Sequence, residues 1–122
     1  MTSILLYIED DDGNVRLVER ILRRRHDIEL HVAGTGQAGV QAARDLRPAL
    51  ILLDNRLPDA SGIEVLRLLA ADRATSAIPV IILSGDTGQS LTRELGAAGA
   101  TGFIEKPFDI HLLLSEIDKH LA

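Results

Sequence analysis

The chain has 122 residues, of which 46% are hydrophobic and 25% charged, a size and balance that suit one globular domain with a single core. A net charge of −5 and the lack of a long basic run disfavour direct binding of nucleic acid. The chain contains no cysteine, which excludes disulfides, thiolate chemistry and cysteine-based zinc sites, and no apolar run approaches the ~20 residues of a membrane span.

Short apolar runs alternate with segments in which apolar residues recur at helical spacing. In chain order, the first half predicts a strand, a helix, a strand, a helix and a strand, over Ile4–Ile8, Val15–Leu22, Ile28–Val32, Ala38–Leu46 and Leu50–Leu53. The second half predicts a helix, a strand, a helix, a strand and a helix, over Ile63–Ala70, Val80–Leu83, Leu91–Ala98, Thr101–Glu105 and Ile110–Leu121. Thr35 is the expected N-cap of the second helix, which should stop before Pro48.

This alternation favours a parallel sheet joined by right-handed helical crossovers. The third predicted strand is apolar throughout, as expected for a strand that helices cover on both faces. No linker, repeat or low-complexity segment interrupts the pattern, so residues 1–122 are expected to form one α/β domain. Open parallel sheets bind ligands at the edge where the carboxyl ends of the strands meet, and we expect a site there.

Chemically active side chains follow four of the five predicted strands. Glu9 and Asp10 come after the first strand, Asp54 after the third, Ser84 after the fourth and Lys106 after the fifth. One edge of the sheet would then hold acids for a metal, a carboxylate nucleophile, a hydroxyl and a cation. These are the groups needed to move a phosphoryl group onto an aspartate.

Each of these residue types also has a structural interpretation. Asp11 could replace Asp10 as the second acid of the pair. Asp12 is expected to serve as a turn residue or helix cap. Asp54 or Ser84 alone could cap a helix, and Lys106 alone could be an ordinary surface lysine. Their joint arrival at one edge of the sheet favours a functional site over these alternatives.

The ordered motifs resemble those of a response-regulator receiver domain of two-component signalling. The matching residues are Glu9-Asp10, Asp54, Leu57-Pro58, Gly62, Ser84-Gly85 and Lys106-Pro107. Their order and spacing agree over essentially the whole chain, so the resemblance is more specific than any single motif. It implies a flavodoxin-like (βα)5 three-layer sandwich with a five-stranded parallel sheet of order 2-1-3-4-5. The domain would be either a stand-alone regulator or part of a hybrid histidine kinase.

The resemblance also implies a phosphoryl acceptor and a metal site. A histidine kinase or a histidine phosphotransfer protein would donate the phosphoryl group from a phosphohistidine to Asp54. Mg²⁺, with Mn²⁺ as an alternative, would be bound directly by Asp10 and Asp54. Glu9 would act on the metal through water, and the backbone carbonyl of Arg56 would complete the protein ligands.

Three further groups would hold the phosphoryl oxygens in such a domain. Lys106 would supply a cation, and the backbone N–H groups of Asn55 and Gly85 would donate hydrogen bonds. A receiver is a signalling phosphoacceptor rather than an enzyme, because it catalyses only its own phosphorylation and dephosphorylation. The resemblance implies a cytoplasmic location, with no direct partner among nucleic acids or membranes.

Receivers of this family read out phosphorylation through a change in packing. Ser84 would turn toward the phosphoryl group and Phe103 would move inward, although Phe103 could also be an ordinary core residue. The change would alter the surface of the fourth helix, the fifth strand and the fifth helix, where a downstream protein or a second copy of the chain would bind. The isomer of the Lys106-Pro107 bond, cis or trans, stays open at this point.

Two charged residues should flank the mouth of the site. Arg56 lies two residues after Asp54, and Asp86 lies two residues after Ser84. We hypothesise that Arg56 and Asp86 form a salt bridge that restricts the hydrolytic water, the alternative being that both are solvated and independent. The four histidines show no metal-ligand spacing.

Three other functions compete with this interpretation. Phosphatases of the haloacid-dehalogenase type use Asp-x-Asp at the nucleophile, whereas Arg56 occupies the second position after Asp54. A pseudo-receiver that never takes a phosphoryl group is disfavoured by the complete set of acids, serine and lysine. A nucleotide-binding flavodoxin-like protein is disfavoured because no glycine-rich phosphate loop follows the first strand.

Overall fold

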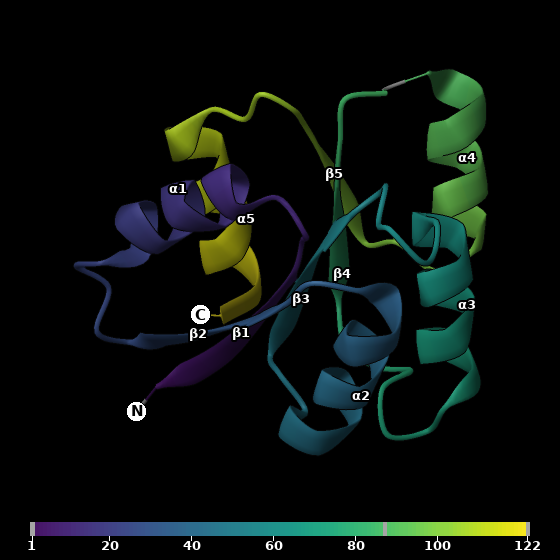
Figure 1. The fold of residues 1–122 in the computed structure, drawn as a ribbon, viewed down its shortest axis with the longest axis horizontal. Helices are drawn as coiled ribbons and strands as arrows, with labels where there is room; N and C mark the ends of the chain where they lie inside the picture. Colours follow the sequence, from purple (N-terminus) through teal and green to yellow (C-terminus); the bar gives the residue numbers. More distant parts are fainter. Residues whose placement is uncertain (1, 87, 122) are drawn as a thin grey trace.

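The computed structural model describes residues 2–86 and 88–121. Strands and helices alternate along the chain in the order β1 Ser3–Ile8, α1 Asp12–Leu22, β2 Ile28–Ala33, α2 Gly36–Leu46, β3 Leu50–Asp54, α3 Gly62–Ala71, β4 Val80–Ser84, α4 Gln89–Ala97, β5 Gly102–Glu105 and α5 Ile110–Leu121. The five strands form one parallel sheet of order β2-β1-β3-β4-β5, which confirms the predicted fold (Figure 1). No helix within the described residues is long and apolar enough to cross a membrane.

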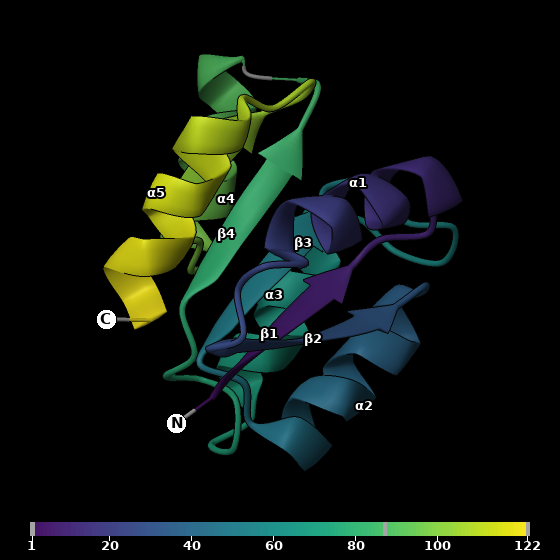
Figure 2. The same cartoon turned by 90° about the vertical axis from the view of Figure 1, so that its left-hand side faces the viewer.

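The helices cover both faces of the sheet. Helices α1 and α5 lie on one face, and α2, α3 and α4 lie on the other (Figures 1 and 2). Successive residues of β1 point to opposite faces, so Leu6 and Ile8 pack toward α2 and α3 while Leu5 and Tyr7 pack toward α1 and α5. Strand β3 is buried at every residue, as predicted for a strand covered on both sides, and β4 is buried at every residue as well.

Strands β3 and β4 each extend one residue further than predicted. Asp54 and Ser84 are the last residues of these strands rather than the first residues of the loops that follow. The reason is the pairing of the strands, because Asp54 lies opposite Leu83 and Ser84 lies opposite Glu105. Both polar side chains are therefore held by the sheet itself, at its edge.

Helices α1 and α2 both begin at a side-chain cap. Thr35 is the N-cap of α2 as predicted, and its hydroxyl accepts a hydrogen bond of 3.0 Å from the Ala38 N–H. The prediction of a cap at Asp12 is wrong by one residue, because α1 begins at Asp12 and its N-cap is Asp11. The Asp11 carboxylate accepts from the Asn14 N–H at 3.0 Å.

Helix α2 lies unusually close to the sheet at Gly39. A Cβ atom added to Gly39 would lie 2.5 Å from the Cδ1 atom of Ile8. Only glycine allows this approach, which sets the position of α2 directly against the strand that leads into Glu9.

Candidate functional site

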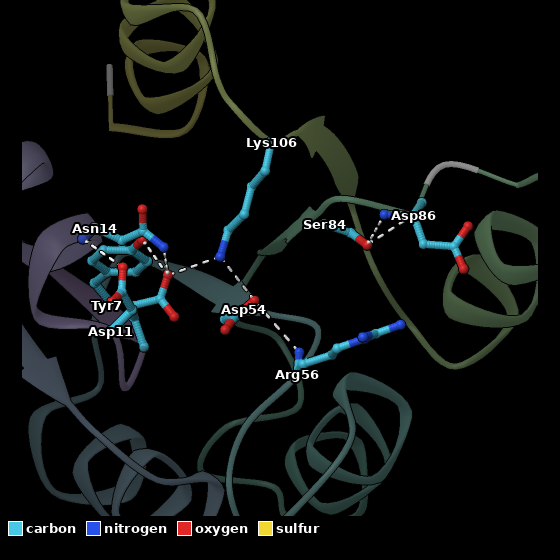
Figure 3. A network of polar contacts seen from close by, with 9 residues as sticks. Tyr7, Asp11, Asn14, Asp54, Arg56, Ser84, Asp86 and Lys106 are labelled. Atoms are coloured by element: carbon cyan, nitrogen blue, oxygen red, sulfur yellow. Dashed lines mark hydrogen bonds and ion pairs between the residues drawn. The ribbon is translucent and has the colours of Figure 1, made fainter.

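The predicted site residues gather at one edge of the sheet, in a cavity and in an acidic cluster beside it. Glu9 and Lys106 immediately follow β1 and β5, and Asp54 ends β3. Figure 3 shows Lys106 reaching toward Asp54, with Ser84 on the other side of the aspartate. The cavity is lined by the last residues of β3 and β4 and by the loops after β3, β4 and β5, namely Asp54, Asn55, Arg56, Ser84, Gly85, Asp86, Gly88 and Lys106.

An acidic cluster lies next to this cavity. One oxygen from each of Glu9, Asp10 and Asp54 lies within 4.8 Å of the others. Glu9 and Asp54 are buried, whereas Asp10 is exposed to solvent. Asp11 is committed to capping α1, so the structure favours Asp10 over Asp11 as the second acid. Closely spaced carboxylate oxygens are the hard donors that Mg²⁺ requires, so the side chains present fit this metal.

Lys106 is the cation of the site. Its Nζ atom donates to Glu9 Oε1 at 2.9 Å and to Asp54 Oδ1 at 3.0 Å. Its side chain is only 20% exposed, so the alternative of an ordinary surface lysine is wrong. The Lys106-Pro107 peptide bond is cis.

Burial and neighbouring charges shift the pKa values of the two buried acids, Asp54 and Glu9, in opposite directions. Burial and, after it, the contact with Glu9 raise the pKa of Asp54 to about 6, against the opposing effect of Lys106. Burial also opposes ionisation of Glu9, but its interaction with Asp54 and the hydrogen bonds that Lys106 and Tyr7 donate hold its pKa below the ordinary value. Burial lowers the pKa of Lys106, but its bonds to Glu9 and Asp54 outweigh this effect and raise the pKa above its ordinary value. Without a metal, Asp54 is therefore the acid that takes up a proton first.

Two residues that the sequence argument did not identify also contact Glu9. The Tyr7 hydroxyl donates to Glu9 Oε1 at 2.9 Å, and the Asn14 side-chain amide donates to the same oxygen at 3.0 Å (Figure 3). The signal for Tyr7 was present in the sequence, because residues two apart on a strand share a face. The signal for Asn14 was absent, since its reach depends on how α1 lies over the sheet.

The loop after β3 corrects one predicted phosphoryl contact. The Asn55 N–H donates to the Leu83 carbonyl at 3.1 Å, because the pairing of β3 with β4 continues into the loop. This donor is therefore already in use, contrary to the prediction. The Arg56 N–H instead approaches the Asp54 carboxylate, with 3.4 Å between its nitrogen and Oδ1.

The same loop is anchored to α2 by a residue that the sequence argument missed. The two carboxylate oxygens of Asp59 accept from the Gly36 N–H at 2.7 Å and from the Gln37 N–H at 3.0 Å. These are free donors of the first turn of α2, where a carboxylate is also favoured by the helix dipole. The contact holds the loop that carries the Arg56 carbonyl.

The predicted switch hydroxyl, that of Ser84, lies at the end of β4 and bonds to the loop that follows. The Ser84 hydroxyl donates to the Asp86 carbonyl and accepts from the Asp86 N–H, both at 2.9 Å. Ser84 does not cap α4, whose N-cap is Gly88. The hydroxyl faces the cavity from a local turn, and a rotation about χ1 would release it.

The predicted salt bridge between Arg56 and Asp86 is wrong. No nitrogen and oxygen of these side chains lie within 4.0 Å of each other, although both residues lie in the part of the chain that the structure describes. The Asp86 carboxylate instead accepts from the Gly88 N–H at 3.0 Å. The reason is local, because a carboxylate readily bonds to the backbone two residues ahead of it.

Phe103 is not a core residue. Its side chain is 40% exposed on β5, so the alternative that places it in the core is wrong for this structure. The predicted inward movement would start from this exposed position. On α5, Ile110 and Leu112 are also exposed large hydrophobic residues.

Comparisons with known proteins point to one family. The model of the response regulator receiver domain matches residues 5–118. The DNA-binding response regulator MtrA of Mycobacterium tuberculosis is 34% identical over 117 residues, which are 95% of this chain and 50% of MtrA. The transcriptional regulatory protein FixJ of Rhizobium meliloti is 30% identical over 119 residues, which are 98% of this chain and 57% of FixJ. The chain thus spans about half the length of these curated relatives.

A solved structure resembles the whole fold. The receiver domain of the sensor histidine kinase PA1611 from Pseudomonas aeruginosa PAO1 superposes with a TM-score of 0.88 at 25% identity, covering 99% of this chain and 98% of that chain. That structure has a magnesium ion coordinated in its active-site cleft.

Proposed function

The chain belongs to the family of response regulator receiver domains, the phospho-accepting domains of two-component signalling, and we propose that Asp54 is its phosphoacceptor. One observation carries this proposal. Asp54 is a buried carboxylate that shares Lys106 with Glu9 at the edge of an open cavity, and a surface or capping aspartate has no need of such partners. The receiver domain that we propose spans residues 1–122.

The chemistry follows from the groups around Asp54. An oxygen of its carboxylate attacks phosphorus while the P–N bond of a phosphohistidine breaks, and the leaving imidazole takes up a proton. Lys106 neutralises charge on the phosphoryl oxygens, and the Gly85 and Arg56 N–H groups donate to them, with Arg56 replacing Asn55 in this role. Ser84 rotates out of its local turn to donate to the new phosphoryl group.

The acidic cluster is proposed to hold Mg²⁺, with Mn²⁺ as a substitute. Asp10 and Asp54 would bind the ion directly, Glu9 through water, and the Arg56 carbonyl would complete the protein ligands. When bound, the ion supplies positive charge that offsets the mutual repulsion of the acids and of the phosphoryl oxygens. The close approach of the three carboxylates within 4.8 Å supports this assignment.

Asp10 and Asp11 offer a matched pair to test the metal site. Asp10→Asn is expected to weaken Mg²⁺ binding by about tenfold or more, because the site loses a charged oxygen ligand. Asp11→Asn should leave the affinity unchanged, because asparagine caps a helix as well as aspartate does. Isothermal titration calorimetry with MgCl₂ measures both. Equal losses in the two variants would mean that general negative charge, rather than ligation by Asp10, binds the ion.

Two kinds of partner are proposed, one that donates the phosphoryl group and one that binds the phosphorylated domain. A histidine kinase or a histidine phosphotransfer protein supplies the phosphoryl group, and the surface of α4, β5 and α5 carries the output to a downstream protein or a second copy. The exposed Phe103 and Ile110 lie on this surface. By name MtrA is a DNA-binding response regulator and FixJ a transcriptional regulatory protein, but the matched region is only about half of each. We propose no direct nucleic-acid contact for this domain, and catalysis limited to its own phosphorylation and dephosphorylation.

Incubation with Mg²⁺ and acetyl phosphate, followed by measurement of the intact mass, tests the proposed function. We expect one phosphoryl adduct that is absent in EDTA, and borohydride trapping with peptide mapping should locate it at Asp54. An adduct at another residue would contradict the assignment. No adduct, together with no response of Ser84 and Phe103 to beryllofluoride, would favour a binding module that never takes a phosphoryl group.

A further inference from the structure

A buried tyrosine hydroxyl lies beside the site and has no part in the chemistry described so far. The Tyr7 side chain is 0% exposed and packs among aliphatic residues such as Leu5 and Leu52, between the sheet and helices α1 and α5. A phenylalanine would fill this space without the cost of removing a hydroxyl from water. Packing therefore explains the ring of Tyr7 but not its hydroxyl.

The hydroxyl is one of three donors that converge on a single oxygen of Glu9. Tyr7 of β1 donates to Oε1 at 2.9 Å, Asn14 of α1 donates at 3.0 Å, and Lys106 after β5 donates at 2.9 Å. A carboxylate has about four lone-pair sites over its two oxygens. Three donors thus fully occupy Oε1, and Oε2 is the oxygen left for the acidic cluster.

Lys106 cannot serve Glu9 alone, because it is shared with Asp54. Its Nζ atom bonds Glu9 Oε1 and Asp54 Oδ1 at nearly equal distances of 2.9 and 3.0 Å. Once Asp54 carries a phosphoryl group, its carboxylate becomes a neutral acyl group, and the charged phosphoryl oxygens become the stronger acceptors for an ammonium. Tyr7 and Asn14 are neutral donors, so the phosphoryl charge does not draw them away to the same degree.

We propose that Tyr7, together with Asn14, is a positioning residue that holds Glu9 Oε1 so that Oε2 stays available to the acidic cluster, which would hold the metal, while Lys106 moves to the phosphoryl group. This inference rests on the proposed function. It gives Glu9 a fixed orientation before and after phosphorylation, whereas a carboxylate held by Lys106 alone would lose its partner during the reaction. Outer partners that orient a ligand in this way commonly contribute to metal affinity.

The test compares two buried hydroxyl groups. Tyr7→Phe removes the donor to Glu9 and keeps the ring. Thr75→Val is the matched control, because the Thr75 hydroxyl is also buried and donates to the Leu69 carbonyl at 2.6 Å, away from the cavity. Asn14→Ala removes the second donor from the surface of α1. Calorimetric titration of each folded variant with MgCl₂, without a phosphodonor, gives the affinity directly.

We expect Tyr7→Phe and Asn14→Ala each to weaken Mg²⁺ binding, by about tenfold as for the loss of other outer partners of metal ligands, and Thr75→Val to leave it unchanged. In the parent protein, Mg²⁺ binding should also change the tyrosine fluorescence. Tyr7 is the only tyrosine and the chain has no tryptophan, so the emission of the protein reports on this hydroxyl. It should change with Mg²⁺ concentration along the calorimetric curve, because the ion draws charge from Glu9.

Unchanged Mg²⁺ affinity in Tyr7→Phe, or an emission that does not follow the metal, would overturn the positioning role. The acetyl phosphate assay on the parent protein separates this failure from that of the proposed function. A phosphorylated parent with an unaffected Tyr7→Phe variant would refute the positioning role alone. A parent that neither binds Mg²⁺ nor takes a phosphoryl group would refute both.

Discussion

An Asp54→Asn variant is expected to take no phosphoryl group from acetyl phosphate and, in EDTA at pH 7, to be more stable than the parent. The first effect follows because an amide is not a competent nucleophile toward phosphorus. The second follows because asparagine has nearly the same shape but carries no charge into a buried position next to Glu9. The pKa of Asp54 is raised from 3.8 to about 6, which corresponds to a cost of about 3 kcal/mol for its ionised form.

The buried charge of Asp54 should also make the stability of the protein depend on pH. Because the pKa of Asp54 in the folded protein lies above its ordinary value, the folded state binds the proton more tightly than the unfolded chain does. The contribution of Asp54 to the stability of the parent should therefore fall as the pH rises from about 4 to about 6, and stay low above it. The variant should lack this component, and urea unfolding at pH 5 and pH 7 in EDTA measures it.

A matched substitution elsewhere controls for the general effect of removing a negative charge. Asp45 is exposed on α2 and bonds only to the Gln41 side chain among the described residues, so Asp45→Asn should change neither the stability nor the phosphorylation appreciably. If Asp54→Asn gains no more stability at pH 7 than Asp45→Asn, Asp54 does not carry the buried charge that the structure indicates. A phosphoryl adduct on Asp54→Asn would overturn its role as acceptor.

Removal of the Lys106 cation should have the opposite effect on stability. Lys106→Met leaves Glu9 and Asp54 buried without a counter-charge, and breaking a buried ion pair on one side costs about 3 kcal/mol or more. The loss should be measured by urea unfolding at pH 7 in EDTA. It should shrink at pH 5, because protonation of Asp54 removes part of the uncompensated charge. Phosphorylation by acetyl phosphate should also slow, since the phosphoryl oxygens lose their cation.

The chain provides a natural control, because Lys106 and Lys119 are its only two lysines. The Lys119 side chain is 63% exposed and pairs with Glu116 on α5, so Lys119→Met should change the stability little. The double variant Asp54→Asn with Lys106→Met should recover much of the loss, since one of the two buried charges is gone. Equal effects of the two lysine substitutions, or additive effects in the double variant, would mean that Lys106 does not neutralise the buried acids.

Much of the fold could be predicted from the pattern of apolar residues. Segments such as Leu50–Leu53 are too short for a helix and apolar on both faces, and their alternation with helical spacing leaves a parallel sheet as the consistent solution. The same logic placed Glu9, Asp54, Ser84 and Lys106 at one edge, because parallel strands end together there.

The predictions of individual contacts were wrong where a side chain or an N–H group could bond to either of two partners. The Asn55 N–H pairs with Leu83 because the β3–β4 ladder continues past the strand, and the Asp86 carboxylate turns to the Gly88 N–H rather than to Arg56. A sequence does not rank such competing bonds, since differences of about 1 kcal/mol or less between neutral hydrogen bonds decide them. Exposure of Phe103 was likewise set by packing rather than by its hydrophobicity.

The sequence by itself determined the class of fold, the order of the elements and the set of reactive residues, because these depend on periodicity and on the position of each residue relative to a strand end. Only the tertiary structure decided how those residues share their partners. The convergence of Tyr7, Asn14 and Lys106 on one oxygen of Glu9 joins β1, α1 and the loop after β5. Such a contact depends on distances of about 3 Å between separate elements, and these are set by the packing of helices on the sheet.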